Sequence, residues 1–398
     1  MVLCILPKDK TRVRFPLPAK FKMKFIELLK KEDLSGKTCL LRVDLNIVEK
    51  EAKNSPRVKG ILPTIKLLVE NGAKVVILSH RGRPQASLAS KAGRPKGFDK
   101  KQSLKPFAKI LSSLLKKQIH FIDFNKNWKK ISTSINRSNG IFLLENLRFF
   151  SEEEKNDAKF AKQLASLGDI YVNDAFAVSH RANASVAAIT KFLPSYAGLL
   201  LEKEIKNLHF AMNPEKPLAV ILGGAKISTK ICLIKNFESK ADYFLIGGGI
   251  AHNFLLAQGL PIGDSIFEEK TVDFAKKMLK NNQVILPVDY VIKNRRILDI
   301  GPKTVKLYSD IIKKSETIIW NGPLGHFEDK KFAKGSEEVA KAILNSKAFS
   351  VIGGGETAAI FQNPKSKIQN PKIFISTGGG AMLEYLAGKK LPGIEALK

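Results

Sequence analysis

Short apolar runs alternate with amphipathic stretches along most of the chain. The apolar runs predict strands, and the amphipathic stretches predict helices. The expected strands are Thr38–Leu45, Lys74–Ser79, Ile119–Ile122, Ile141–Glu145, Ile170–Asn173, Leu218–Leu222, Tyr243–Ile246, Gln283–Val288, Thr317–Trp320, Ser350–Ile352 and Lys372–Ser376. The expected helices include Pro63–Asn71, Leu104–Lys117, Ala158–Leu167, Lys270–Asn281 and Glu337–Asn345. This alternation is typical of α/β proteins whose parallel sheets carry helices on both faces.

The pattern divides the chain near its middle. A charged helical stretch, Leu199–Met212, leads into the sequence NPEKP, after which a new series of strands, glycines and helices begins. A length of 398 residues also suggests two or three domains. We therefore predict two doubly wound, Rossmann-like parallel-sheet domains, 23–198 and 214–385, joined by a hinge helix at 199–213.

The first residues, Met1–Lys22, differ from the rest of the chain. They are basic, contain three prolines, and lack the long apolar segment and cleavage site of a secretory signal. We expect a disordered tail, or a start codon upstream of the true start at Met23. A transit peptide is the alternative.

Composition narrows the class of protein. Apolar residues make up 44% of the chain, which excludes global disorder. No apolar stretch is long enough to cross a membrane. The cysteines, Cys4, Cys39 and Cys232, are too few and too far apart for a disulfide framework or a metal site. We therefore expect a cytoplasmic protein that does not bind a membrane.

The charge of the chain has several interpretations. The 67 Lys and Arg residues against 37 Asp and Glu residues give a formal net charge of +30. Such an excess occurs in proteins that bind nucleic acids. It also arises from lysines spread over solvated faces, from the amino-acid usage of the source, or from a pocket for a small anionic substrate.

Four expected strands of the second half end in a glycine cluster that a helical pattern follows. The segments are AVILGGAKISTK, FLIGGGIAHNF, SVIGGGETAA and FISTGGGAMLEYL. Ligands of parallel sheets bind beyond the carboxyl ends of the strands, where glycine allows close backbone approach and helix N-termini favour anions. One such cluster is often only a tight turn, but four together predict a phosphate or nucleotide site.

Common nucleotide- and metal-binding motifs are absent from the sequence. Gly36-Lys37-Thr38 matches the end of a P-loop, but Lys31 occupies the first glycine position and the segment precedes a strand. No GxGxxG opens a βαβ unit, so dinucleotide binding is disfavoured. Neither an HExxH zinc motif nor a GxSxG nucleophile elbow occurs.

Arginine and histidine residues follow several strand ends of the first half. Arginine binds phosphate or carboxylate through a planar pair of donors, and the strand ends of a parallel sheet meet at one edge. We therefore predict a compact anion pocket, in which Asp44 pairs an arginine or contacts a hydroxyl group. The residues are Arg42, Asp44, Arg57, His80, Arg83, Arg148, His180 and Arg181.

From about Lys24 to its end, the chain resembles the phosphoglycerate kinase family. The motifs occur in the family's order and spacing as LRVDLN, LPTI, SHRGRP, LLENLRF, YVNDAF, SHRANAS, LGGAKIST-K, IGGG, WNGPLGHFE, VIGGGETAA and STGGGAMLEYLAGKKLPGIEAL. The resemblance implies Mg²⁺-dependent, reversible phosphoryl transfer between 1,3-bisphosphoglycerate and ADP, giving 3-phosphoglycerate and ATP. It also implies a hinge-bending monomer whose last segment, 386–398, returns to the N-terminal domain.

The resemblance implies roles for residues at matching positions. The N-terminal domain would bind 3-phosphoglycerate or 1,3-bisphosphoglycerate through Asp44, Asn46, Arg57, His80, Arg83, Arg148 and Arg181. Arg57, and Lys226 from the other domain, would neutralise the transferring phosphoryl group. The nucleotide would contact Gly224, Lys226, Lys230, Gly248, Asn321, Pro323, Glu328, Gly353, Gly354, Gly355, Glu356 and Thr357. Glu328 would bond the ribose, and Glu356 would be linked to Mg²⁺ on the nucleotide.

Several positions depart from the family pattern, among them Glu356, Asn183, Ala177, Thr229 and the sequence NIV after Asp44. Glu356 stands where the family usually has aspartate, and its longer arm changes the reach toward the metal. Asn183 replaces a histidine of the basic patch, and Ala177 replaces a glycine. Because Arg57, Lys226 and the glycine runs are retained, we expect an active enzyme.

Two other interpretations are a non-catalytic relative that still binds nucleotide and a basic, nucleic-acid-associated protein. Against the second, the chain lacks a helix-turn-helix, an RNA-recognition motif and a zinc module, and its arginines follow strand ends instead of one helix. We therefore expect small-molecule substrates and no nucleic-acid partner.

Overall fold

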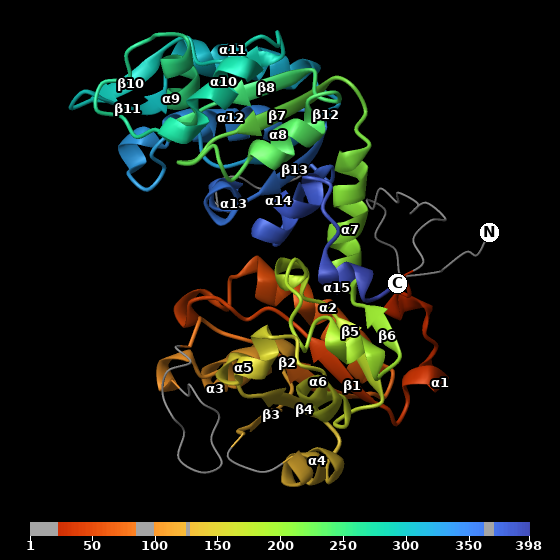
Figure 1. Ribbon diagram of the computed structural model, residues 1–398. Coiled ribbons are helices and arrows are strands. Elements are labelled where there is room, and N and C mark those ends of the chain that lie inside the picture. Colours follow the sequence, from red (N-terminus) through yellow and green to blue (C-terminus); the bar gives the residue numbers. More distant parts are fainter. Residues whose placement is uncertain (1–22, 85–98, 125–127, 362–369) are drawn as a thin grey trace. The chain divides into compact units, whose positions relative to one another are not determined.

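The computed structural model describes residues 23–84, 99–124, 128–361 and 370–398. The extension Met1–Lys22, expected to be disordered, lies outside the described residues. The chain forms two compact units (Figure 1). The N-terminal unit comprises residues 23–205 together with Lys390–Lys398, and the C-terminal unit comprises Lys206–Lys389.

A six-stranded parallel sheet forms the centre of the N-terminal unit, in the order β3-β4-β2-β1-β5-β6. Its strands are β1 (Thr38–Arg42), β2 (Lys74–Leu78), β3 (Ile119–Ile122), β4 (Ile141–Leu144), β5 (Ile170–Asn173) and β6 (Ser195–Ala197). Every residue of β1, β4 and β5 is buried. Continuous apolar runs such as these are what strands buried on both faces require.

This unit also contains helices, which are α1 (Lys31–Leu34), α2 (Pro56–Glu70), α3 (Lys105–Leu115), α4 (Trp128–Asn136), α5 (Ser151–Glu154), α6 (Ala158–Ala165) and α15 (Pro392–Glu395). The two longest of these, α2 and α3, pack onto the sheet. Ile65 of α2 and Phe107 of α3 join Leu41 of β1 in one buried core. The C-terminal α15 is held by the N–H of Gly393, which donates to the Ser179 carbonyl at 2.8 Å.

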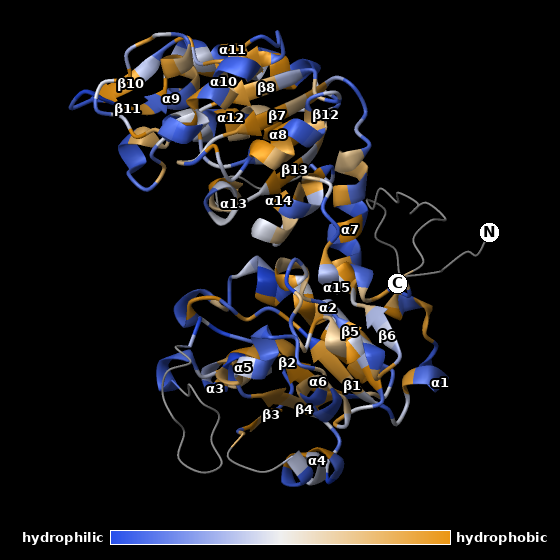
Figure 2. Ribbon diagram, viewed as in Figure 1, coloured by the Kyte–Doolittle hydropathy of each residue, from blue (hydrophilic) through white to orange (hydrophobic). Residues whose placement is uncertain are grey.

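A second six-stranded parallel sheet forms the centre of the C-terminal unit, in the order β14-β13-β12-β7-β8-β9. Its strands are β7 (Leu218–Leu222), β8 (Tyr243–Ile246), β9 (Val284–Ile285), β12 (Thr317–Asn321), β13 (Phe349–Gly353) and β14 (Ile373–Ile375). A separate antiparallel hairpin pairs β10 (Tyr290–Lys293) with β11 (Arg296–Ile300). Hydrophobic residues follow the strands of both six-stranded sheets (Figure 2).

The helices of the C-terminal unit mostly follow the glycine-rich strand ends. They are α8 (Ile231–Phe237), α9 (Gly248–Ala257), α10 (Val272–Met278), α11 (Pro302–Lys314), α12 (Lys334–Leu344), α13 (Gly355–Phe361) and α14 (Gly380–Leu386). Tyr308 of α11 is fully buried and donates its hydroxyl to the Ile246 carbonyl at 2.6 Å. None of the described helices is long and apolar enough to span a membrane.

The boundary between the units falls within α7 (Leu199–Met212), between Ile205 and Lys206. In the N-terminal unit, Asp174 Oδ1 accepts the N–H groups of Leu200 and Leu201 at 2.8 and 3.0 Å. The carboxylate therefore caps the first turn of α7, where backbone N–H groups lack a partner within the helix.

The predicted α/β fold with two parallel sheets is confirmed. The helix expected at Pro63–Asn71 instead begins at Pro56, so that Pro63 lies inside α2. The pattern misplaces this start because proline is common in the first turn of a helix and rare in its interior. The pattern also misses β6, which is short, and the β10–β11 hairpin, whose mixed and largely exposed residues lack an apolar run.

Candidate active site

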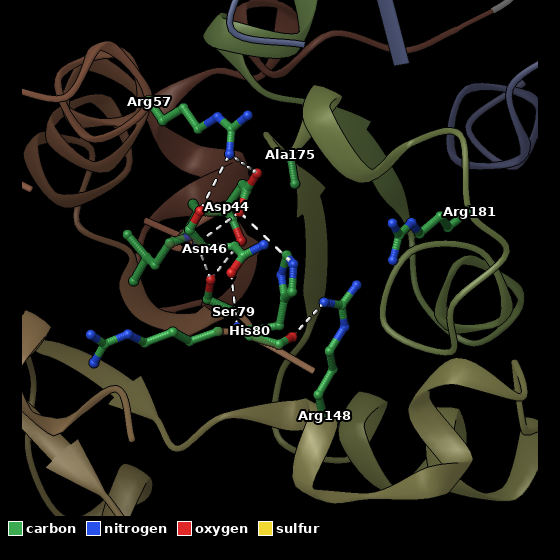
Figure 3. Close-up of polar contacts among 12 residues, drawn as sticks. Asp44, Asn46, Arg57, Ser79, His80, Arg148, Ala175 and Arg181 are labelled. Carbon is green, nitrogen blue, oxygen red and sulfur yellow. Dashed lines mark hydrogen bonds and ion pairs between the residues drawn. The ribbon is translucent and has the colours of Figure 1, made fainter. Parts of the chain in front are cut away.

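Strand ends of the N-terminal sheet bring most of the predicted anion-pocket residues together (Figure 3). Arg42 ends β1, Asp44 follows it, and His80 follows β2. Arg148 lies in a short 3-10 helix after β4. These strands are neighbours in the parallel sheet, so their carboxyl ends meet at one edge. Arg57 comes from the first turn of α2 instead of a strand end.

Asp44 is the centre of a polar cluster. Its Oδ2 lies 3.2 Å from Arg57 Nη1, and its Oδ1 accepts the Asn46 N–H at 2.8 Å (Figure 3). Arg57 Nη1 also donates to the Asn46 carbonyl at 3.4 Å. The Asn46 side chain in turn accepts the N–H of Gly82 at 2.8 Å. The Arg57 side chain is 31% exposed, so this guanidinium is oriented by Asp44 yet remains open to a ligand.

Arg148 is a buried cation of the same site. Its Nη1 donates to the Gly82 carbonyl at 2.7 Å, and its Nε lies 3.4 Å from Glu154 Oε1. Burial lowers the pKa of Arg148 to about 10. The negative charge of Glu154 acts to raise this pKa, and the positive charge of Arg181 acts to lower it further. Positive charge is therefore incompletely neutralised here, which favours an anionic ligand.

His80 lies among the arginines. Burial lowers its pKa well below the usual value, and the charges of Arg42, Arg148, Arg181 and Arg57 lower it further. Figure 3 shows Arg148 and Arg181 with their guanidinium groups turned toward the space beside His80. This side chain is therefore neutral although it lies among cationic groups.

Arg83 does not join this cluster. It is exposed, and within the described part of the chain it makes no hydrogen bond or ion pair with the residues above. Its neighbour Arg81 lies over the Phe107 ring, 5.2 Å from the centroid, and donates to the Ser103 carbonyl at 3.2 Å.

Sequence analysis missed two residues behind the cluster, Glu153 and Ser185, both fully buried. Glu153 belongs to the acidic run SEEE, which has the composition of a solvated helix surface. Nothing in the sequence marks this glutamate as the buried member of the run.

Glycine loops line the carboxyl edge of the C-terminal sheet. The N–H of Gly224, after β7, donates to the Pro323 carbonyl at 2.7 Å. A Cβ on Gly223 would lie 2.0 Å from the same carbonyl oxygen, so a side chain does not fit. The N–H of Gly248, after β8, donates to the Leu324 carbonyl at 2.8 Å. The loops after β7, β8 and β12 therefore pack backbone against backbone.

The loop between β13 and α13 is more open. A Cβ on Gly355 would meet no atom within 4 Å. Gly354 has a φ of 96°, which glycine adopts without strain. Thr357 and Asn321 are buried beneath the loop, and Thr357 Oγ1 accepts the N–H of Gly322 at 2.8 Å. The open space above Gly355 leaves room for a ligand beside the first turn of α13.

Two lysines follow β7. Lys230 is 6% exposed, and its Nζ would lie 3.5 Å from a Cβ on Gly224. Burial lowers the pKa of Lys230, while the charges of Glu356 and Glu268 act against this. Lys226 is exposed. Both lysines belong to the loop that begins at the Gly224 turn.

Glu268 holds the turn between these lysines. Ser228 donates its N–H and its hydroxyl to the two Glu268 oxygens at 2.9 and 2.7 Å. Asn253 donates from Nδ2 to the Glu268 carbonyl at 2.7 Å. Partial burial acts to raise the pKa of Glu268, but the Ser228 hydrogen bonds and the Lys226 charge outweigh it and lower the pKa. Sequence analysis missed Glu268 because it lies 40 residues from Ser228 along the chain.

The two predicted nucleotide-site glutamates are exposed. Glu328 is 61% exposed, with Oε2 3.4 Å from His326 Nδ1. Glu356 stands in the first turn of α13. Among the described residues, no cluster of three or more His, Cys, Asp or Glu side chains would hold a metal by itself. One exposed carboxylate beside the glycine loops fits Mg²⁺ that arrives on a nucleotide, because that ion takes most of its ligands from phosphates and water.

An arginine cluster at the sheet edge of one α/β unit, with glycine loops and two lysines in the other, offers the groups that a phosphotransferase needs. A family model described as Phosphoglycerate kinase matches residues 29–389. The chain belongs to the phosphoglycerate kinase family. It is thus a kinase for a carboxyl-group acceptor, and its substrates are the small molecules phosphoglycerate and ATP or ADP.

Individual relatives agree with the family match. The chain is 45% identical to phosphoglycerate kinase from Wolbachia sp. subsp. Brugia malayi (strain TRS), over 92% of this chain and 96% of the relative. It is 43% identical to that of Dictyoglomus turgidum, over 93% and 98%. The solved phosphoglycerate kinase of Coxiella burnetii has a TM-score of 0.79 at 37% identity, over 94% of this chain and 98% of that one. These comparisons do not support the non-catalytic or nucleic-acid interpretations.

Proposed function

We propose that the two units divide the substrates between them. The N-terminal unit binds 3-phosphoglycerate or 1,3-bisphosphoglycerate, and the C-terminal unit binds ATP or ADP. The observation that carries this division is the contrast between the sites. One holds arginines around the buried His80, with four of them close enough to lower its pKa. The other holds glycine loops and the lysines Lys226 and Lys230.

Phosphoglycerate carries a carboxylate, a hydroxyl and a phosphate, and the N-terminal cluster offers matching groups. We assign its binding to Asp44, Asn46, Arg57, His80, Arg83, Arg148 and Arg181. The carboxylate of Asp44 accepts a hydrogen bond from the substrate hydroxyl, and the arginines bind the anionic ends. The exposure of Arg83 leaves it free to reach a ligand from the rim.

The nucleotide takes the open space at the glycine loops. We assign its binding to Gly224, Lys226, Lys230, Gly248, Asn321, Pro323, Glu328, Gly353, Gly354, Gly355, Glu356 and Thr357. Lys230, which is buried and has no ion pair among the described residues, regains a charge partner when phosphate binds. Glu356 is the carboxylate assigned to Mg²⁺, which neutralises phosphate oxygens when bound with the nucleotide.

Arg57 and Lys226 carry the catalytic roles in this proposal. Phosphoryl transfer needs little covalent help from protein groups, because the reacting oxygens need alignment and the moving group needs charge neutralisation. Asp44 already orients Arg57 at 3.2 Å. The Glu268–Ser228 contact fixes the loop of Lys226. That α7 serves as a hinge for the reaction stays a prediction.

We also infer that the protein acts on its small-molecule substrates as a cytoplasmic monomer, without a nucleic-acid or membrane partner. Calorimetry of the full chain and of a version starting at Met23 tests whether both substrates bind and whether a nucleic acid competes with them. Each should bind 3-phosphoglycerate and Mg·ADP as one-to-one ligands. Duplex DNA or RNA that competes with either ligand at physiological salt would contradict the proposal.

A pair of glycine substitutions separates folding from nucleotide binding. Gly223→Ala should lower the free energy of unfolding by about 1–3 kcal/mol, since its Cβ overlaps the Pro323 carbonyl. Gly355→Ala should leave stability unchanged but raise the KM for ATP about tenfold, the equivalent of one lost hydrogen bond. Thermal denaturation and steady-state kinetics measure the two effects. An unchanged KM in Gly355→Ala would place the phosphates elsewhere.

Glu268→Ala should raise the KM for ATP about tenfold, because the loop of Lys226 and Lys230 loses two hydrogen bonds to a charged acceptor. Glu269→Ala is the matched control, since Glu269 is the exposed neighbouring carboxylate. Equal effects of the two substitutions would show that only the local charge matters and that the Ser228 contact does not.

A further inference from the structure

A buried contact between His80 and Arg42 determines which ring nitrogen of His80 carries the proton. Both side chains are 1% exposed. Arg42 Nη2 lies 3.2 Å from His80 Nδ1. A guanidinium has only N–H donors, so the imidazole nitrogen in this contact must be the acceptor. Nδ1 of His80 therefore carries no proton, and in the neutral ring the proton is on Nε2.

Arg42 has no freedom to turn away from His80. Its Nε donates to Ser185 Oγ at 2.8 Å, its Nη1 donates to the Val43 carbonyl, and its Nη2 lies 3.8 Å from Glu153 Oε1. Glu153 is itself held by Ser185, whose N–H and hydroxyl donate to its two oxygens at 2.9 and 2.5 Å. The guanidinium is thus locked by partners on several sides, and the buried carboxylate balances its charge.

The other ring nitrogen faces the anion pocket. His80 Nε2 lies 4.0 Å from Asp44 Oδ1, beyond hydrogen-bonding distance. Among the described residues it has no hydrogen-bond partner, although the side chain is buried. This N–H has no acceptor at hydrogen-bonding distance, so it is available to a ligand oxygen.

The surroundings oppose a second proton on the ring. The charged groups facing it are Arg42 and Asp44 from β1 and the turn after it, Arg57 of α2, Arg148 after β4, and Arg181 after the 3-10 helix Phe176–Val178. Burial, followed by the four arginines, lowers the pKa of His80 well below its usual value. A cationic ring would also place an N–H against the N–H of Arg42.

We propose that Arg42 and Glu153 are positioning residues that keep His80 in its neutral Nε2–H form. His80 then gives the bound phosphoglycerate one neutral hydrogen bond, and the arginines alone supply the positive charge. Substrate binding is thereby insulated from the pH range in which histidine normally titrates. This inference rests on the proposed role of His80 in phosphoglycerate binding.

The tautomer is measured directly on the wild-type chain by NMR of ¹⁵N-labelled histidine, with the His80 signals assigned by their absence in His80→Asn. We expect a protonated Nε2 and a bare Nδ1 from pH 5.5 to 8.5, and a shifted Nε2 signal on adding 3-phosphoglycerate. A proton on Nδ1, or titration of the ring within this range, would overturn the proposal. An unchanged Nε2 signal with bound 3-phosphoglycerate would refute the substrate contact alone, while turnover tests the activity separately.

The double variant Arg42→Met/Glu153→Met tests the positioning role, because it removes the buried pair together and leaves no lone charge. At pH 8 the KM for 3-phosphoglycerate should rise about tenfold, as expected for one misplaced hydrogen bond, with a smaller change in kcat. In this variant the ¹⁵N signals of His80 should show both tautomers, because Nδ1 no longer faces the Arg42 donor, while burial and the remaining arginines still keep the ring neutral. Lys341→Met/Glu338→Met removes an exposed ion pair and is the control. A variant ring that still carries its proton only on Nε2 would contradict the role, and if the double variant does not fold, the wild-type tautomer decides.

Discussion

Replacing Arg57 with alanine should lower kcat about 10³–10⁵-fold, the range in which a cation that stabilises a transferring phosphoryl group acts. The KM for ATP should change little, because Arg57 belongs to the unit assigned to phosphoglycerate. Arg57→Lys should recover only part of the loss, since an ammonium group cannot form the paired contact of a guanidinium. Steady-state kinetics in both directions measure these effects.

The fold of the Arg57 variant must be checked separately, because Asp44 loses its ion-pair partner at 3.2 Å. Asp44 keeps the Asn46 N–H, so we expect the melting temperature to fall only slightly. Arg137→Ala is the control, since Arg137 is an exposed arginine of the same unit. Wild-type turnover in a folded Arg57→Ala protein would remove Arg57 from the mechanism.

Lys226→Ala should cause the second large loss of activity, with kcat reduced about 10²–10³-fold. This is the effect of removing one preorganised hydrogen-bond donor to the charge that develops in the transition state. Lys226 is exposed and its backbone carbonyl accepts the Thr229 hydroxyl at 2.9 Å, so truncation of its side chain should not disturb the fold. A contact made mainly in the transition state lowers kcat and kcat/KM together.

The neighbouring lysines give a matched comparison for Lys226. Lys230→Ala should act mainly on the KM for the nucleotide, because this buried cation is assigned to ground-state phosphate binding. Lys235→Ala, an exposed position on α8, should change neither constant. If Lys226→Ala raised only the KM for ATP, its role would be binding and not catalysis.

Strands buried on both faces were the part of the fold most open to prediction from sequence, as β7 and β8 of the C-terminal sheet illustrate. β7 and β8 begin and end where the apolar runs do, because strands buried on both faces need unbroken apolar sequence. The glycines after them are equally informative. Gly223 lies so close to the Pro323 carbonyl that only glycine fits there. The presence of glycine in the sequence therefore indicates that two backbone segments approach each other closely.

Contacts between distant segments set the limit of sequence-based prediction. Arg42 is among the predicted residues, but its burial against Glu153 depends on how α5 packs beside β1, and local pattern does not encode that. Glu268 likewise reaches Ser228 across 40 residues. The role of a side chain that positions another side chain, as Glu153 and Glu268 do, can therefore be recognised only in the folded structure.

The structure also gives the surroundings of two residues, Asn183 and Glu356, that depart from the family pattern. Asn183 is buried, as Arg42, His80 and Arg148 are, whereas Arg83 is exposed. Glu356 is exposed and close enough to Lys230 to influence its pKa, so its longer arm keeps an electrostatic link to the lysine assigned to nucleotide binding.

The most direct test of the central claim is turnover of the purified full chain with 3-phosphoglycerate, ATP and Mg²⁺. Acyl phosphate formed on the carboxyl group is trapped and quantified, with wild type, Arg57→Ala and Lys226→Ala measured side by side. We predict Mg²⁺-dependent formation of 1,3-bisphosphoglycerate by the wild type and near-complete loss in both variants, with each variant still folded. Equal turnover by all three proteins, or no transfer by the wild type, would contradict the account.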